Sequence, residues 1–271
     1  MLDFVMPAAY AVLVWWFATG IILFLDGLPR RTFRWSMSAA TVLLVIVAVE
    51  LHASAGDVSA AGAYTAFTCA ILVWGWLEMS FLMGFITGPR KHACLECCSG
   101  WRHFLHASQA IIFNELATLA GALAILGATR HAPNQLALGV YLILWTMRLS
   151  AKLNLFLGVP NLGEKFLPAH LQYLKSFFRK RPMNILFPVS VSLSTIGVVL
   201  LVQRYLAVTD PFKTTAYALM ASLLALAVLE HWFMVIPLPS EKMWKWAMRP
   251  AEPRITAKAD EPARAQARAA R

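Results

Sequence analysis

Residues 63–86 read AYTAFTCAILVWGWLEMSFLMGFI, and Glu78 is the one charged side chain in the stretch. About 20 predominantly apolar residues are enough for a helix to cross a bilayer. The stretch therefore predicts a transmembrane helix, and the whole composition agrees. Hydrophobic residues make up 59% of the 271 residues and charged residues only 14%, whereas about a quarter of a soluble domain is charged. This balance argues against a soluble enzyme and against a disordered chain.

Six further apolar runs of comparable length lie before and after this one. The seven candidates cover residues 7–25, 35–52, 63–86, 104–128, 136–155, 185–206 and 214–236. The predicted fold class is an all-α integral membrane protein, a bundle of about seven transmembrane helices. We expect residues 1–248 to form this domain, in contact with the lipid bilayer.

The positions of lysine and arginine predict the orientation, because cytoplasmic loops carry an excess of both. We place the N-terminus outside and the C-terminus in the cytoplasm. Of the 24 lysines and arginines, all but Arg130, Arg204 and Lys213 then lie on the cytoplasmic side. The net charge of +10 therefore belongs to the loops and tail of a membrane protein, and we expect no nucleic-acid partner.

The longest predicted loop, residues 158–184, is cytoplasmic and amphipathic. Between residues 169 and 180 its apolar side chains have helical spacing and its basic residues follow at the end. This pattern predicts a helix on the membrane surface, where the charge binds anionic lipid or docks a partner. Residues 249–271 are rich in Ala, Arg, Glu and Pro, and we expect a disordered basic tail.

Ionisable side chains inside the predicted helices are costly and mark a functional site by default. At about 1.5 Å per residue, Glu78 lies roughly 13 Å and Glu115 roughly 16 Å from the inner ends of their helices. The other polar groups fall in the same cytoplasmic half of the bilayer. The expected intramembrane cluster comprises Glu78, Asn114, Glu115, Arg148, Asn154, Glu230 and His231.

Three interpretations of this cluster are open. One is an iron or manganese site, because carboxylates and histidines on separate helices can hold two such ions. Its ligands would be Glu78, Glu115, Glu230, His231 and His106, although the repeated Glu-x-x-His pattern of di-iron bundles is absent. Another is a tetrapyrrole site in which His231 or His106 ligates the central metal. In the third, the carboxyls are neutral or paired with cations and hold the helices together.

Cys94, Cys97 and Cys98 form a separate candidate site between the third and fourth predicted helices. Their Cys-x-x-Cys spacing suits zinc or a redox pair, with His92 or His103 as further ligands. Under the predicted orientation this loop faces the reducing cytoplasm, so a structural disulfide is not expected. The other interpretation is a set of reduced thiols in a tight interfacial loop.

Several longer motifs resemble one known family. They are WGWLEMSF at 74–81, TGPR at 87–90, RLSAKLNLFLGVPN at 148–161, LPAHL at 167–171 and EHWF at 230–233. With Trp15-Trp16 near the start, these blocks are similar to those of the PuhE-type photosynthetic complex assembly proteins. The resemblance runs from residue 15 to about residue 236 and leaves only the tail uncovered.

The resemblance implies a multi-pass protein of the inner or intracytoplasmic photosynthetic membrane of purple bacteria. It implies a role in assembling reaction-centre and light-harvesting complexes, or in the supply and handling of bacteriochlorophyll. The implied partners are reaction-centre or light-harvesting polypeptides or pigment-synthesis enzymes, with bacteriochlorophyll or a precursor as a possible ligand. The alternative function is a metal-dependent membrane enzyme that acts on a tetrapyrrole or another hydrophobic substrate through Glu78, Glu115, Glu230 and His231. Whether the protein is an enzyme is left open.

Overall fold

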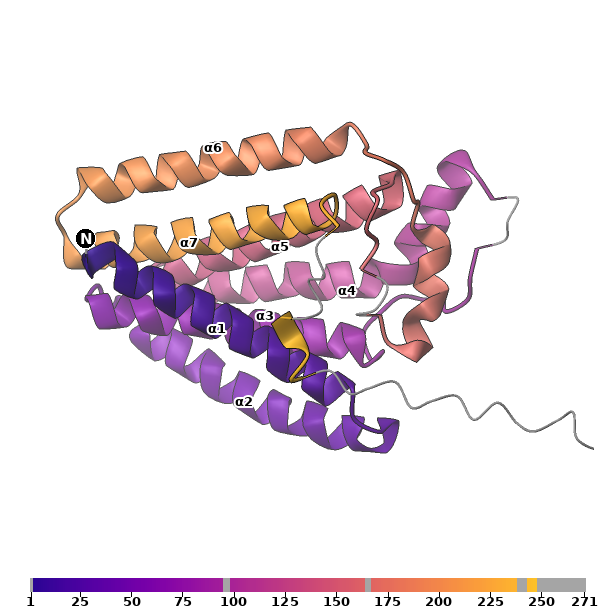
Figure 1. The fold of residues 1–271 in the computed structure, drawn as a ribbon. Helices are drawn as coiled ribbons and strands as arrows, with labels where there is room; N and C mark the ends of the chain where they lie inside the picture. The colour runs from indigo at the N-terminus through magenta and orange to yellow at the C-terminus, as the bar shows by residue number, and fades with distance from the viewer. Residues whose placement is uncertain (1, 95–97, 164–166, 238–242, 248–271) are drawn as a thin grey trace, which may run out of the picture.

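The computed structural model describes residues 2–94, 98–163, 167–237 and 243–247. Within these residues, seven helices are long and apolar enough to cross a membrane, which confirms the predicted fold class. They are α1 Leu2–Asp26, α2 Phe33–Ala53, α3 Ala60–Leu82, α4 Gly100–Thr129, α5 Leu136–Leu157, α6 Leu186–Ala207 and α7 Pro211–Phe233 (Figure 1). The short 3-10 helices between them are η1 Arg30–Thr32, η2 Ser54–Gly56 and η4 Ala169–Phe177. The expected tail, 249–271, lies outside the described residues.

Local chemistry sets where several helices begin and end. The Ser59 hydroxyl accepts a hydrogen bond from the Gly62 N–H at 3.1 Å and so caps α3. The Asp210 carboxylate caps α7 in the same way, satisfying a backbone donor that a helix start leaves unpaired.

We predicted the third helix to run to residue 86, but α3 ends at Leu82. The chain turns at Gly84, whose φ of +83° favours glycine.

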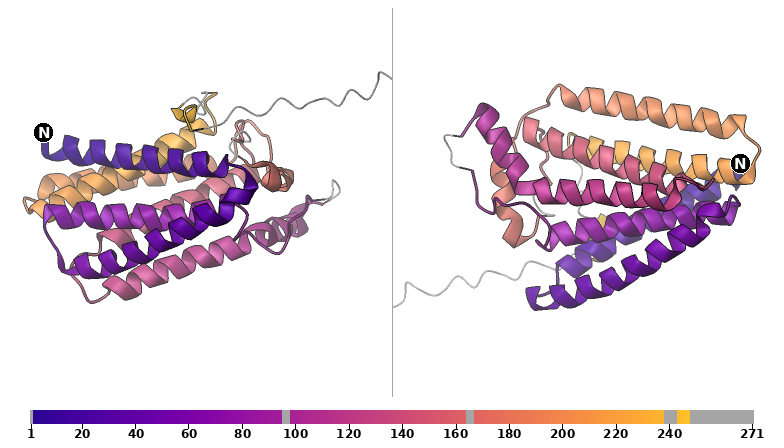
Figure 2. Two further views of the ribbon diagram at one scale, coloured as in Figure 1. Left: turned by 90° about the horizontal axis from the view of Figure 1, so that it is seen from below. Right: turned by 180° about the vertical axis from the view of Figure 1, so that it is seen from behind.

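The helices run antiparallel along one axis, with α3 and α7 the most buried. Helix α3 packs on α1, α2, α5 and α7, while α6 packs mainly on α7. Helices α2 and α6 therefore lie at opposite edges of the bundle (Figures 1 and 2). The start of α1 and the short α2–α3, α4–α5 and α6–α7 turns share one end. We call the opposite end, which holds the α3–α4 and α5–α6 connections, the loop end.

Small residues allow the central helices to pack closely. Ala63, Ala66 and Ala70 repeat along α3 and are at most 2% exposed. Close backbone approach of this kind favours helix association in a membrane, where apolar burial alone supplies little driving force. Tyr141 of α5 is completely buried in the same core and donates a 2.8 Å hydrogen bond to the Thr118 carbonyl of α4.

The segment expected on the membrane surface packs on the bundle instead. Residues 169–177 form the 3-10 helix η4, whose Leu171, Leu174 and Phe177 are each at most 5% exposed. They contact Phe81 at the end of α3 and Ala110 of α4. The apolar face of η4 thus covers the loop end of the bundle and is not available to lipid.

The α5–α6 connection also caps the ends of three helices. His170 Nε2 lies 2.7 Å from the Leu82 carbonyl at the end of α3. The Asn161 amide donates to the carbonyls of Phe233 and Ile236 at the end of α7, and the Asn184 amide donates to that of Gly158 after α5. These groups satisfy carbonyls that a helix end leaves without partners.

The segment 243–247 returns to the first helix. Trp244 Nε1 donates to the Trp16 carbonyl, and Trp16 Nε1 donates to the Met243 carbonyl, both at 3.2 Å. The rings of Trp15 and Trp244 meet edge to face at 5.5 Å. These tryptophans therefore connect the segment 243–247 to α1.

Candidate functional site

Two basic side chains of α5 pair with carboxylates of neighbouring helices. Arg148 Nη2 lies 2.7 Å from Glu78 Oε2 on α3, and Lys152 Nζ lies 2.7 Å from Glu115 Oε1 on α4. Arg148 and Lys152 are four residues apart, so they share one face of α5. We call these four residues the ion-pair network; it ties α3 and α4 to α5.

The network is only partly accessible. Arg148 keeps 39% of its side-chain surface exposed, but Glu78, Lys152 and Glu115 keep only 16–20%. An unpaired charge is costly among apolar helices, and a close partner offsets much of that cost. The pairing therefore accounts for four charged residues in three helices that are otherwise largely apolar.

Aromatic side chains surround the Lys152–Glu115 pair. Trp145, about two turns before Lys152 on α5, donates from Nε1 to Glu115 Oε2 at 3.5 Å. The Lys152 ammonium lies 5.3 Å from the centre of the Phe81 ring, within the range of a cation–π contact. The pair is therefore held in one place by contacts from three helices.

A second polar group occupies another face of α5, towards α6 and α7. His231 Nε2 lies 2.9 Å from the Ser150 hydroxyl, and Nδ1 lies 2.9 Å from the Ala227 carbonyl. The Ser150 hydroxyl donates to that of Ser190 on α6. Asn154, fully buried, donates to the Ser150 carbonyl, and its Oδ1 has no hydrogen-bond partner.

The remaining predicted residues differ in exposure. Glu230 is exposed on α7, where its carboxyl interacts with Arg148 and the Trp15 side chain. Asn114 is 4% exposed, and its backbone N–H donates to the Thr87 carbonyl at 3.0 Å. Glu230 thus differs from Glu78 and Glu115 in that part of its surface is accessible, in addition to its contacts with Arg148 and Trp15.

The residues of the expected iron or manganese site do not come together in the structure; they contact different partners in different places. Among the described residues, one group of three or more potential ligands has its ligand atoms within 4.8 Å of one another, and it consists of Cys94, Cys98 and His106. Glu78 and Glu115 face cations, and His106 faces two thiols. The geometry does not assemble the five-ligand set.

The tetrapyrrole hypothesis meets a similar obstacle at His231. A histidine that ligates a pigment metal needs a free ring nitrogen and an open approach. Both ring nitrogens of His231 have hydrogen-bond partners, and the residue is 2% exposed. The imidazole as it stands is a link between helices.

Cys94 and Cys98 lie beside His106 at the start of α4. The His106 Nδ1 atom is 3.5 Å from the Cys94 sulfur and 3.2 Å from the Cys98 sulfur. The sequence paired these cysteines with His92 or His103, whereas the structure brings His106 to them. Cys97 lies outside the described residues.

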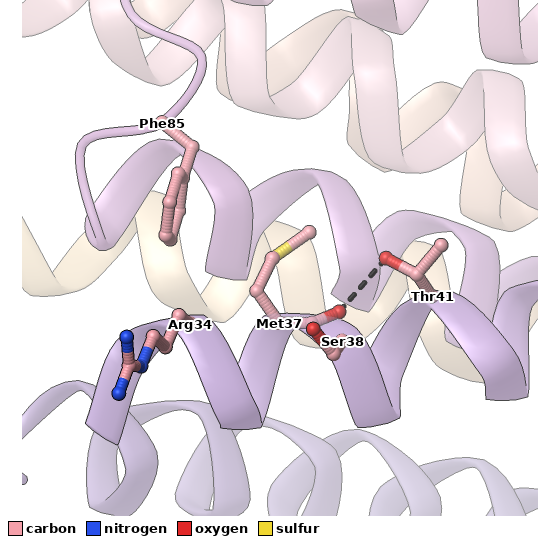
Figure 3. A pocket seen from close by; sticks show the side chains of 5 residues that line it. All are labelled: Arg34, Met37, Ser38, Thr41 and Phe85. Atoms are coloured by element: carbon pink, nitrogen blue, oxygen red, sulfur yellow. Dashed lines mark hydrogen bonds between the residues drawn. The ribbon is translucent and has the colours of Figure 1, made fainter. Parts of the chain in front are cut away.

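Two surface hollows lie away from the ion-pair network. One, of about 410 Å³, is open and lined by Arg34, Met37, Ser38, Thr41 and Phe85 (Figure 3). The other, of about 340 Å³, lies between α1, α2 and α3 and includes Tyr10, Glu50 and Cys69 in its lining. Neither is lined by a residue of the network, so these hollows do not give access to it.

Sequence reasoning missed Ser150, Ser190 and Trp145 as site residues. Hydroxyl and indole groups do not interrupt an apolar run, so hydropathy gives no warning of them. Spacing was the available signal, because Ser150 and Asn154 lie one turn apart on α5 and so share a face.

Fold and site together define a seven-helix membrane protein in which polar side chains of α5 link five helices. The chain belongs to the family described as "Protein of unknown function (DUF3623)", whose sequence model matches residues 1–254. A relative from Rhodobacter capsulatus, described as "Uncharacterized 30.4 kDa protein in puhA 5'region", is 36% identical over 249 residues. The match covers 90% of this chain and 91% of the relative. No solved structure matches the chain.

Proposed function

We propose that this protein is a membrane assembly factor for the bacterial photosynthetic apparatus. It would act in reaction-centre and light-harvesting complex assembly or in the supply and handling of bacteriochlorophyll. The observation that carries the proposal is the full-length relative from the puhA 5' region, a photosynthesis gene region. The resemblance to PuhE-type assembly proteins points the same way.

The geometry favours a binding role over metal-dependent catalysis. The two glutamates best placed for a metal are paired with Arg148 and Lys152. Glu230 and the 39% exposed Arg148 are instead available on the bundle surface. At membrane depth such groups favour a partner that brings a polar group of its own, such as a partner helix or a pigment.

We further propose that the protein lies in the inner or intracytoplasmic membrane with its loop end in the cytoplasm. The excess of lysine and arginine at that end supports this orientation. Fluorescent-protein and alkaline-phosphatase fusions at residue 247 test it. The fluorescent fusion should be bright and the phosphatase fusion inactive; the reverse result would overturn the orientation.

Complementation tests the function. In Rhodobacter capsulatus lacking the 30.4 kDa relative, we expect less near-infrared absorbance from reaction-centre and light-harvesting complexes per unit of membrane protein. Expression of this chain should restore it. Unchanged absorbance in the deletion strain would contradict the proposal.

Two variants connect this assay to the site. Glu230→Gln removes the exposed charge beside Arg148 and should reduce the restoration, provided that the variant reaches wild-type levels in the membrane. Glu50→Gln, which changes an exposed glutamate on α2, is the matched control and should restore absorbance fully. If Glu230→Gln restored absorbance as fully as Glu50→Gln, Glu230 would not take part in the proposed contact.

Copurification separates pigment handling from metal catalysis. The protein is isolated from phototrophically grown membranes, and its absorption spectrum and metal content are measured on one sample. Bound bacteriochlorophyll, or copurified reaction-centre or light-harvesting polypeptides, would support the proposal. Stoichiometric iron or manganese without pigment or polypeptide would favour the enzyme instead.

A further inference from the structure

The Cys94–Cys98–His106 group lies apart from the ion-pair network, at the loop end of the bundle. Cys94 belongs to the α3–α4 connection, Cys98 lies just before α4, and His106 is in the second turn of α4. Helix α4 has 30 residues and is therefore about 45 Å long, which exceeds the roughly 30 Å hydrocarbon core. Part of α4 therefore extends beyond the hydrocarbon core, and its first turns project from the bundle in Figure 2.

The distances match those between ligands of one tetrahedral metal ion. With metal–sulfur bonds of about 2.3 Å and metal–nitrogen bonds of about 2.0 Å, a tetrahedral ion holds sulfur and nitrogen roughly 3.6 Å apart. The two sulfur–nitrogen distances here are 3.5 and 3.2 Å. One nitrogen faces both sulfurs, and all three ligand atoms lie within 4.8 Å of one another.

The charge of the surroundings also suits a metal bound by thiolates. The positive charges of Arg90 and Arg102 act on His106, so the group lies in basic surroundings. A divalent ion with two thiolates and a neutral imidazole carries no net charge, so the arginines do not repel the complex.

Neighbouring groups hold the ligands in place. The Cys94 N–H donates a 2.8 Å hydrogen bond to the Ser176 hydroxyl, which in turn donates to the Tyr173 carbonyl of η4. Cys94 also packs against the apolar cluster beneath η4, which includes Ala110. Contacts of this kind outside the ligand shell orient metal ligands and are part of the site.

We propose that Cys94, Cys98 and His106 bind one Zn²⁺ ion, which joins the α3–α4 connection to the first turns of α4. Two sulfurs and one imidazole nitrogen suit zinc, and three protein ligands leave a fourth position for water or an exchangeable ligand. On binding, both thiols lose their protons to solvent, and the neutral imidazole ligates through Nδ1. This zinc-binding proposal does not depend on the proposed photosynthetic function.

Zinc content of the full-length protein in detergent tests this proposal. The protein is supplied with Zn²⁺, freed of loose metal on a chelating column, and analysed by mass spectrometry. We expect about one zinc per chain, because the described residues contain one such three-ligand group. Cys98→Ser and His106→Gln should weaken binding by more than the roughly 10–100-fold that loss of an outer-shell partner costs.

Matched controls and a spectroscopic probe keep the test decisive. Cys69→Ser changes the buried thiol of α3, and His131→Gln changes an exposed histidine near the other end of α4; both should retain zinc. Co²⁺ should give a sulfur-to-metal charge-transfer band in the wild type and controls that is weaker in Cys98→Ser. Ser176→Ala, which keeps all ligands, should weaken binding by about 10-fold.

Unfolding of a variant is checked by its helical circular dichroism, and only variants with wild-type helicity are compared. If the wild type retains no zinc, the proposal is overturned. It is equally overturned if Cys98→Ser and His106→Gln retain as much zinc as their controls, which would mark the metal as adventitious.

Discussion

Arg148 on α5 donates a 2.7 Å hydrogen bond to Glu78 on α3, although 70 residues separate them in the sequence. Each side chain is charged in an otherwise largely apolar helix, and each is the ion-pair partner of the other. The contact gives α5 a fixed rotation against α3. Lys152, one turn later, extends the same arrangement to Glu115 on α4.

Removing one member of the Arg148–Glu78 pair should destabilise the bundle. Glu78→Gln removes the ion-pair partner of Arg148 and leaves it only the interaction with Glu230, and breaking a buried pair costs about 3–5 kcal/mol. Because Arg148 is 39% exposed, we expect a smaller loss of about 2 kcal/mol. Thermal unfolding in detergent measures it, with Glu50→Gln as the control on α2.

The double variant Glu78→Gln with Arg148→Gln distinguishes a paired contact from two independent ones. Paired residues give a double variant that is less destabilised than the sum of the single variants, with a coupling of about 0.5–3 kcal/mol. Strict additivity would show that the pair does not hold α3 and α5 together.

Gly88→Ala should destabilise the junction between the α3–α4 connection and α4. A Cβ at residue 88 would meet the Gln109 carbonyl oxygen and lie 2.6 Å from the Ala110 carbonyl carbon. Both are backbone atoms that cannot rotate away, so we expect a loss of about 1–3 kcal/mol. Gly127→Ala is the matched control, because a Cβ there meets no atom within 4 Å. A similar melting temperature for both variants would contradict the close approach.

Asn161→Ala should loosen the end of α7. The Asn161 amide donates to the Phe233 carbonyl at 3.1 Å and to the Ile236 carbonyl at 2.7 Å. Loss of both bonds should cost about 1–3 kcal/mol. Asn161→Asp keeps the shape but replaces the donor with a carboxylate at a helix C-terminus, where negative charge is unfavourable. It should therefore be no more stable than Asn161→Ala, and a wild-type melting temperature for Asn161→Asp would exclude the cap.

Hydropathy was sufficient to predict the seven helices, because each apolar run is long enough to cross a bilayer without help from its neighbours. It could also place Glu78 and Glu115 at membrane depth. It could not predict that Arg148 and Lys152 are their partners, because pairing depends on which faces of α3, α4 and α5 meet. The same limit applies to His106, whose partners Cys94 and Cys98 follow from the fold of a loop.

The loops were the least predictable part. The 169–177 segment has the amphipathic pattern of a surface helix, yet its apolar residues cover the loop end of the bundle. A bundle end and a lipid surface are both apolar, and a sequence pattern does not distinguish them. Similarly, Asn161 and His170 looked like ordinary loop residues, because a capping role is visible only when the helix end is nearby.

Stability should depend on pH through His170. Burial lowers the pKa of His170 below its ordinary value of 6.5; the hydrogen bond to the Leu82 carbonyl opposes this shift, and the positive charge of Arg30 adds to it. The unfolded chain therefore binds a proton at a higher pH than the folded chain does. By linkage, stability is unaffected well above pH 6.5 and falls as the pH drops from about 6.5 towards the folded pKa. We expect a lower melting temperature at about pH 5.5 than at about pH 7.5.

His170→Gln tests whether this residue is responsible. The Gln side chain has an N–H that can donate to the Leu82 carbonyl, as the imidazole Nε2 does at 2.7 Å, but it does not titrate. The variant should therefore keep most of the stability at pH 7.5 and lose less of it on acidification. His131→Gln, at an exposed position away from η4, should leave the pH dependence unchanged. If the wild type and His170→Gln lost stability equally between the two pH values, another group would carry the effect, and the cap at the end of α3 would not titrate.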